Sequence, residues 1–286
     1  MQKSVLTMSL IGSLLFCPHE TLTINVQTLK ETLPQQDITQ DNNEHGKTTI
    51  DDEDNVAREY NDPMHKDLWR SVLDGGDEEE VKLALEKGGF DINHQNNQGF
   101  TILMIASLLG RLTIVKLLLE AGADPNLQEH DGNTALMLAA AEPAQERDLL
   151  DIIRELLKSG ARPNSQAIDG RTALHFAAAS GNIDIIHELL IAGANPNIKT
   201  AEGVIEFQFH PDSAAPNVTA VGGVTALHIA VGLKYVDVVK ELLAAGAAPD
   251  IKTDNFNGLT PLHMAYELQN SAIIQLLEDA IANRRP

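Results

Sequence analysis

One threonine recurs along the sequence at nearly constant spacing, and this repetition restricts the fold more than any other feature. Each copy follows a glycine by two residues and opens a short apolar segment with helical spacing; the copies are Thr101, Thr134, Thr172, Thr225 and Thr260. The intervals of 33, 38, 53 and 35 residues fit a period of about 33 residues with insertions of 5, 20 and 2 residues. Such a period predicts a stack of similar units rather than one closed domain.

Each period contains a second helical segment and a stop signal. In the fourth unit, Ile185-Ile186 and Leu189-Leu190 are four residues apart, which places them on one face of a helix. A Gly-Ala-x-Pro-Asn/Asp stretch follows the second segment, as in "GANPN" at 193–197. Glycine favours the left-handed conformation that ends a helix, and proline prevents the helix from resuming. The repeating unit is therefore a helix, a tight turn, a second helix and an extended turn.

The tetrapeptide that begins at each threonine identifies the kind of repeat. It reads "TILM", "TALM", "TALH", "TALH" and "TPLH" in chain order. The last copy matches the signature of the ankyrin repeat, the two "TALH" copies differ from it only at the proline, and the first two copies depart at the histidine. Residues 66–286 therefore closely resemble an ankyrin repeat domain.

This resemblance implies an all-α solenoid of about six helix-turn-helix repeats with extended hairpin turns and one enlarged β-hairpin insertion. The expected repeats cover 66–97, 98–130, 131–168, 169–200 followed by the insertion 201–221, 222–256 and 257–286. Polar residues stand where inner repeats are apolar in the first unit, at Lys82 and Glu86, and in the last, at Glu278. These substitutions fit the polar outer faces that terminal units of a stack need.

The resemblance also implies a role for the histidines. In ankyrin repeats the threonine hydroxyl caps its helix and bonds to the histidine ring, which also bridges the backbone of adjacent turns. We therefore assign structural roles to Thr101, Thr134, Thr172, His175, Thr225, His228, Thr260 and His263. The three rings should lie about 10 Å apart, too far to share one metal ion. We predict no metal, no cofactor and no catalytic residue, since no nucleophile, base and orienting group converge.

The composition narrows the class of partner. The formal charge is −20, with 41 acidic and 21 basic residues, which disfavours a nucleic acid and favours a basic protein surface. Aromatic residues make up only 4%, so the core must consist of Ala, Leu, Ile and Val. Cys17 is the single cysteine, which excludes an intrachain disulfide. We expect a monomer that binds another protein.

Two segments precede the predicted repeats. Residues 1–17 contain the apolar run Val5–Phe16, which is too short to span a bilayer but suits the centre of a secretory signal. The alternative is an apolar terminus of a cytosolic protein, so export and a cytoplasmic location both stay open. Residues 18–62 are polar and acidic, which predicts a disordered linker. We predict no integral membrane span.

Binding by such a stack is expected on its concave face, which the turn tips and the exposed ends of the first helices form. The candidate contact residues at the helix ends are Leu108, Leu109, Glu142, Ser180, Leu233 and Leu268. The alternative interpretation of the leucines is ordinary scattered apolar surface.

The 20-residue insertion is the most individual part of the sequence. Ile205, Phe207 and Phe209 alternate with polar residues, which predicts a strand, and "VTAV" at 218–221 could return beside it. We expect an elongated hairpin at 201–221 whose aromatic residues contact the partner; the alternative is that they pack on their own repeat.

The sequence thus predicts a non-catalytic scaffold that binds a partner protein through the concave face and the 201–221 hairpin. One alternative is an inhibitor or immunity-type module that occludes an enzyme. The other is an unrecognised enzyme.

Overall fold

A computed structural model describes residues 68–69, 71–72, 78–141, 148–201, 208–209, 216–217, 222–254 and 258–284. The chain divides into two compact units, Thr23–Ile92 and Met1–Leu22 with Asn93–Pro286. The predicted apolar segment 1–17 and acidic linker 18–62 lie outside the described residues. Within the described part of the chain, no helix combines the length and apolarity needed to cross a membrane.

The smaller unit contains helix α5, Glu78–Lys87. Three glutamates in its first turn and Lys87 in its last turn complement the helix dipole. Val81 is buried, whereas Lys82 and Glu86 are exposed. This exposure agrees with the polar character that the sequence assigned to these two positions.

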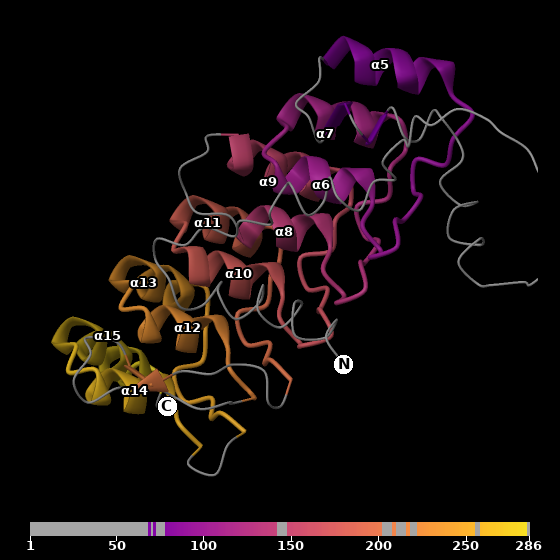
Figure 1. Cartoon of the computed structure of the whole chain (residues 1–286). Helices are drawn as coiled ribbons and strands as arrows, with labels where there is room; N and C mark the ends of the chain where they lie inside the picture. The colour runs from indigo at the N-terminus through magenta and orange to yellow at the C-terminus, as the bar shows by residue number, and fades with distance from the viewer. Residues whose placement is uncertain are drawn as a thin grey trace, which may run out of the picture. The chain divides into compact units, whose positions relative to one another are not determined.

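The described residues of the larger unit form five pairs of helices, one pair for each repeated threonine (Figure 1). The first and second helices of the pairs are α6 (Ile102–Leu108) and α7 (Leu112–Glu120), α8 (Ala135–Ala141) and α9 (Asp148–Lys158), α10 (Ala173–Ser180) and α11 (Ile183–Ile191), α12 (Ala226–Gly232) and α13 (Val236–Ala244), and α14 (Pro261–Glu267) and α15 (Ser271–Ala282). The predicted all-α repeat architecture is confirmed.

The helices of the larger unit lie in two layers. The first helices α6, α8, α10, α12 and α14 pack on one another in chain order, and the second helices α7, α9, α11, α13 and α15 do the same. Each first helix also packs on the second helix of its own pair. Every helix therefore contacts its partner and the corresponding helices of the neighbouring repeats, as expected for a solenoid.

The hydrophobic core lies between the two layers. The first helices contribute small residues such as Ala139, Ala177 and Ala230, none of which is exposed to solvent. Their size allows neighbouring first helices to approach closely. The second helices contribute branched residues on one face, for example Ile185 and Ile186 of α11, which are also fully buried. The core of the larger unit is thus built mainly from small and branched aliphatic residues, and Phe176 is a buried aromatic side chain within it.

The insertion contains a short antiparallel pair of strands, β1 (Gln208–Phe209) and β2 (Pro216–Asn217). Gln208 pairs with Asn217 and Phe209 with Pro216. The predicted returning strand at 218–221 lies outside the described residues and stays a prediction. Proline has no N–H to donate, but it is tolerated at the edge of so short a pair. The remainder of the elongated hairpin lies outside the described residues and stays a prediction.

The turn that carries the insertion keeps the hydrogen bonds of an uninterrupted turn. In the turn before it, the N–H of Ala167 donates to the carbonyl of Arg171 over 2.9 Å. In the interrupted turn, the N–H of Thr200 donates to the carbonyl of Val224 over 2.9 Å, and the N–H of Val224 donates to Oγ1 of Thr200 over 3.1 Å. Thr200 and Val224 therefore close the base of the insertion.

Both arms of the interrupted turn also keep their bonds to the neighbouring turns. The N–H of Ala201 donates to the carbonyl of Asp169 over 2.8 Å, and the N–H of Asp254 donates to the carbonyl of Gly222 over 2.9 Å. The insertion thus lies between Ala201 and Gly222. Joining these two residues directly would restore a turn of the same length as that formed by residues 167–171.

We expect a variant lacking residues 202–221 to fold with a free energy of unfolding equal to, or about 1 kcal/mol above, that of the full chain, because the shorter loop costs less entropy to close. Urea unfolding measures this value. A control lacking residues 201–221 also loses the bond from Ala201 to Asp169 and should be less stable by about 1 kcal/mol. A loss of more than about 2 kcal/mol in the first variant would contradict this account.

A candidate protein-binding face at the turns

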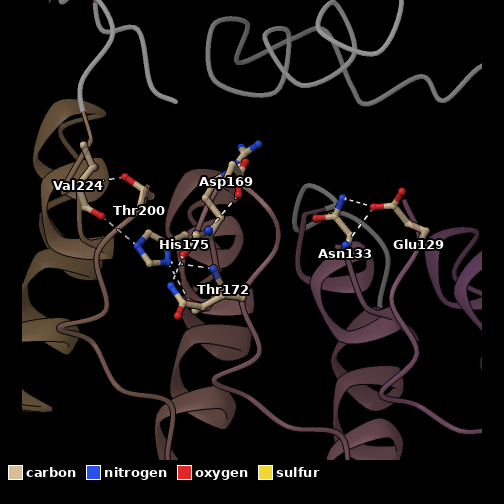
Figure 2. A network of polar contacts seen from close by, with 10 residues as sticks. Glu129, Asn133, Asp169, Thr172, His175, Thr200 and Val224 are labelled. Carbon is tan, nitrogen blue, oxygen red and sulfur yellow. Dashed lines mark hydrogen bonds and ion pairs between the residues drawn. The ribbon is translucent and has the colours of Figure 1, made fainter. Parts of the chain in front are cut away.

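Hydrogen bonds between a threonine and a histidine organise the turn before α10 (Figure 2). The backbone N–H of Thr172 donates to Nδ1 of His175 over 3.2 Å, and Oγ1 of Thr172 lies 2.9 Å from the same nitrogen. Because Nδ1 accepts, Nε2 carries the proton and donates to the carbonyl of Val224, 3.2 Å away in the next turn. The ring therefore links the start of α10 to the adjacent repeat.

His228 makes the same contacts one repeat later. Its Nδ1 accepts from the N–H of Thr225 over 3.2 Å, and its Nε2 donates to the carbonyl of Leu259 over 3.2 Å. His175 and His228 are both buried, and burial lowers the pKa of each ring to about 4. Both rings are therefore neutral at pH 7, as a ring that accepts at one nitrogen and donates at the other must be.

The other repeats lack a histidine bridge to a following turn. Nδ1 of His263 lies 3.1 Å from Oγ1 of Thr260, but its ring is exposed, and the described residues include no further turn to receive Nε2. In the first two pairs the position is occupied by Met104 and Met137. The sulfur of Met104 accepts from the N–H of Thr101 over 3.3 Å, but a thioether has no proton to donate onward.

Glu129 is a buried carboxylate whose hydrogen-bond donors lie in its own turn (Figure 2). Its Oε1 accepts from the backbone N–H of Asn133 over 3.0 Å and from the side-chain amide of Asn133 over 2.7 Å. Its Oε2 accepts from the N–H of Asp131 over 2.7 Å. Three donors thus offset the cost of burying this charge. Sequence reasoning missed Glu129, because the residue occurs in one repeat and gives no periodic signal.

Asparagines of the Gly-Ala-x-Pro-Asn stretch connect successive repeats. Asn126 donates to the carbonyl of Gly160 over 3.0 Å and accepts from the N–H of Arg162 over 2.9 Å. Asn164 and Asn197 make the equivalent pairs of bonds to the repeats that follow them. Sequence reasoning assigned roles only to the glycine and proline of this stretch, although the recurrence of asparagine was an available signal.

Glutamines form a second connection between the turns. Nε2 of Gln128 donates to the carbonyl of Gly132 in its own turn over 2.6 Å and to that of Gln166 in the next turn over 2.9 Å. Gln95, one turn earlier, makes the same two kinds of bond. At the interrupted turn the equivalent residue is a lysine, Lys199, and its ammonium group instead forms an ion pair with the next turn.

Backbone groups at the turn tips also join successive turns. The N–H of Ile168 donates to the carbonyl of Asp131 over 2.9 Å, as that of Ala201 does to Asp169. Gly132 lies at this crossing with a φ of 84°, and a Cβ atom there would stand 2.8 Å from the nitrogen of Ile168. Such a distance leaves no room for a side chain. The repeated glycine is therefore required by the close approach of the next turn.

The structure corrects one of the predicted contact residues at the ends of the first helices. Leu108 is only 6% exposed, so the prediction that it faces solvent is wrong. Every residue of α6 is buried, because this apolar helix is covered on all sides. Leu109, Leu233 and Leu268 are half-buried and stay predicted contact residues.

Of the remaining predicted contact residues, the structure describes the side chain of Ser180 alone. Ser180 is half-buried, and its hydroxyl donates to the carbonyl of Ala140 in α8 over 3.3 Å, which joins two first helices. Glu142, Ile205 and Phe207 lie outside the described residues. Phe209 belongs to β1, but its side chain lies outside the described part. The roles of these residues in binding stay predictions.

His187 and Glu188, which begin a sequence similar to a zinc-protease motif, contact different helices. Nδ1 of His187 lies 2.7 Å from Oε1 of Glu241 in α13, and this hydrogen bond raises the pKa of the ring. Glu188 accepts from Arg154 of α9 over 2.8 and 2.6 Å. The two side chains therefore form no joint site. Among the described residues, no group of three or more His, Cys, Asp or Glu side chains could hold a metal ion.

Comparison with known proteins agrees with this geometry. A family model described as "Ankyrin repeats (3 copies)" matches residues 122–200 and 201–285, and another, "Ankyrin repeats (many copies)", matches residues 85–139. The chain belongs to the ankyrin repeat family. Ankyrin repeats are generally protein–protein interaction modules and are typically non-catalytic.

Similar proteins include a solved ankyrin repeat domain from Acinetobacter baumannii, with 27% sequence identity and a TM-score of 0.59 over 74% of this chain and 96% of that one. The ankyrin repeat protein L86 of Acanthamoeba polyphaga mimivirus is 54% identical over 17% of this chain. An ankyrin repeat-containing protein of Treponema pallidum is 38% identical over 25% of this chain. The matches cover 9% and 24% of these two curated relatives, respectively.

We expect the free energy of unfolding to decrease as the pH falls from about 6.5 to 4. Because the folded pKa values of His175 and His228 are lowered to about 4, the unfolded chain binds more protons in this window. The contribution is complete above the unfolded pKa of about 6.5 and is lost as the pH falls through the folded value. Each ring accounts for about 3 kcal/mol of this decrease in the free energy of unfolding. Urea unfolding at several pH values across this range measures the decrease.

Replacing both rings with methionine provides the control, since methionine occupies this position in α6 and α8. The variant His175→Met with His228→Met should lose about 1 kcal/mol per missing bond at pH 7. Its stability should also depend less on pH than that of the wild type. If the free energy of unfolding of the double variant changed between these two pH values as much as that of the wild type, the buried rings would not be the source of the pH dependence.

We expect Gly132→Ala to destabilise the protein more than Gly160→Ala. Their φ angles are 84° and 89°, so either alanine is strained by about 1 kcal/mol. Only at Gly132 would the new Cβ meet a neighbouring backbone, since nothing lies within 4 Å at Gly160. Thermal or urea unfolding should show a loss of about 1 kcal/mol for Gly160→Ala and about 3 kcal/mol for Gly132→Ala. Equal losses would mean that neighbouring turns are not closely packed.

Proposed function

We propose that this chain binds another protein through its concave face and the 201–221 hairpin, and that it catalyses no reaction. The concave face consists of the turn tips and the exposed ends of the first helices. Membership of the ankyrin repeat family supports protein binding in general. The choice of surface is specific to this chain and depends on the turn that carries the insertion.

The observation that carries the proposal is the closed base of this insertion. Thr200, Gly223 and Val224 close their turn by hydrogen bonds among themselves, and Ala201 and Gly222 keep the bonds to both neighbouring turns. The array therefore has no structural need for residues 202–221. A segment of this length at a turn tip, including two phenylalanines, is suited to contacting a partner.

The state of the histidines supports a non-catalytic role. The two rings in the middle of the array, His175 and His228, are buried and neutral, and both nitrogens of each ring are engaged in holding turns together. A buried ring with both nitrogens occupied is not available to a substrate as a general base.

The charge of the chain supports a basic surface on the partner. The formal charge of −20 attracts cationic groups and increases the rate of encounter with them. We further propose that the chain is a monomer, which light scattering coupled to size exclusion tests directly.

We expect the double variant Phe207→Ser with Phe209→Ser to lose partner binding while its melting temperature stays within a few degrees of the wild type. The residues lie in a segment that the array does not need, but they supply the aromatic contact area that dominates many interfaces. Affinity capture from a lysate with the wild type, the double variant and the 202–221 deletion measures this loss. Unchanged capture by both variants would refute the proposed role of the hairpin.

The same experiment separates a scaffold from an inhibitor. When a captured partner is an enzyme, its turnover is measured with and without saturating amounts of the chain. A scaffold leaves turnover unchanged, whereas an inhibitor that occludes the active site lowers it, and removal of residues 202–221 then restores it.

A further inference from the structure

Ile168 is an exposed aliphatic side chain at the tip of the turn that precedes the insertion. It is 75% exposed, the largest exposed fraction among the large hydrophobic residues of the described part of the chain. Its backbone contributes to the array through the bond to Asp131, but its side chain is largely exposed to solvent. The isoleucine side chain is therefore not explained by the stability of the fold.

The residues at the equivalent place in the neighbouring turns are polar or small. His130 and Ala201 occupy the place defined by the same backbone bond, from the tip N–H to the preceding turn. Ile168 is therefore a large apolar residue at a position where the neighbouring turns have a polar or a small residue. It also lies beside the insertion, since the N–H of Ala201 donates to the carbonyl of Asp169, the residue next to Ile168.

Three acidic residues lie in the turn of this side chain and in the turn before it. Asp131 is joined to Ile168 by the backbone bond of 2.9 Å, and the carboxylate oxygens of Glu129, in the same turn as Asp131, accept from N–H groups of that turn. Asp169 follows Ile168 directly, and its carboxylate is paired with the guanidinium of Arg171. The segments 128–133 and 166–171 contain three acidic residues and one arginine, so these two turns carry a net negative formal charge.

We propose that Ile168 anchors an apolar side chain of the partner, with Asp131 attracting a lysine or arginine beside it. The inference rests on the proposed function and names the chemistry of the bound segment: an aliphatic or aromatic residue next to a basic one. The apolar contact supplies affinity and the carboxylate supplies orientation and rate of encounter. The next turn carries the insertion, and the N–H of Ala201 donates to the carbonyl of Asp169, so partner residues at Ile168 would lie next to the base of the insertion at Ala201.

The test uses a defined probe, a library of 12-residue peptides displayed on phage and selected on the immobilised full chain. We expect the enriched peptides to combine an apolar residue with an adjacent lysine or arginine. Synthetic copies should bind Ile168→Asn about 10-fold to 100-fold more weakly than the wild type, which corresponds to losing the burial of one aliphatic side chain. They should bind Asp131→Asn about threefold more weakly at low salt, and this difference should vanish at high salt.

Two variants serve as matched controls. Ile191→Asn removes another exposed isoleucine, 69% exposed at the end of α11, and Glu120→Gln removes an exposed carboxylate at the end of α7. Neither should weaken binding. Equal affinity for wild type and Ile168→Asn, equal losses with the control variants, or no enrichment of such peptides would overturn the inference.

These failures are distinguishable from failure of the proposed function. Capture of a partner by the wild type but not by the 202–221 deletion would support the hairpin even if Ile168→Asn binds normally. If the 202–221 deletion and the Phe207→Ser with Phe209→Ser variant capture the partner normally and only Ile168→Asn loses it, the proposed role of Ile168 is supported and that of the hairpin is refuted.

Discussion

Each pair of successive turns in this array is joined by backbone hydrogen bonds at the turn tips. The N–H at one tip donates to the carbonyl at the preceding tip, as from Ile168 to Asp131 and from Ala201 to Asp169. A hydrogen bond of this kind contributes about 1 kcal/mol, so neighbouring repeats stabilise one another through their turns. The helices, the glycines at the crossings and the position of the insertion all follow from keeping this series of bonds intact.

Side chains reinforce the backbone series in more than one way. Asparagines and glutamines connect most successive repeats, whereas histidine bridges are limited to two of them. Where Met104 takes the place of histidine, the turn that follows is organised by the buried carboxylate of Glu129 instead. Because several connections act in parallel, one of them can change its chemistry in a given repeat without disturbing the stack.

The same redundancy explains why the turns can carry function. A turn whose ends are closed by Thr200 and Val224 tolerates a long insertion, and a tip whose backbone is paired leaves its side chain unconstrained. Ile168 and the insertion occupy two adjacent tips of this kind. The helices offer less freedom, since most side chains of the first helices are buried between neighbours. Recognition by this chain is therefore expected to concentrate at the turns.

The sequence by itself determined the number and order of the helix pairs in residues 98–284, because apolar spacing, the glycine–threonine signal and the proline stops are all local features. It misjudged Leu108, since a helix that is apolar on every side carries no signal for which side faces solvent. Only the tertiary structure decided which groups meet across repeats: His175 with Val224, Asn126 with Gly160, and Ile168 with Asp131. These pairs are far apart along the chain, and insertions of unequal length displace them, so their meeting depends on how the repeats stack.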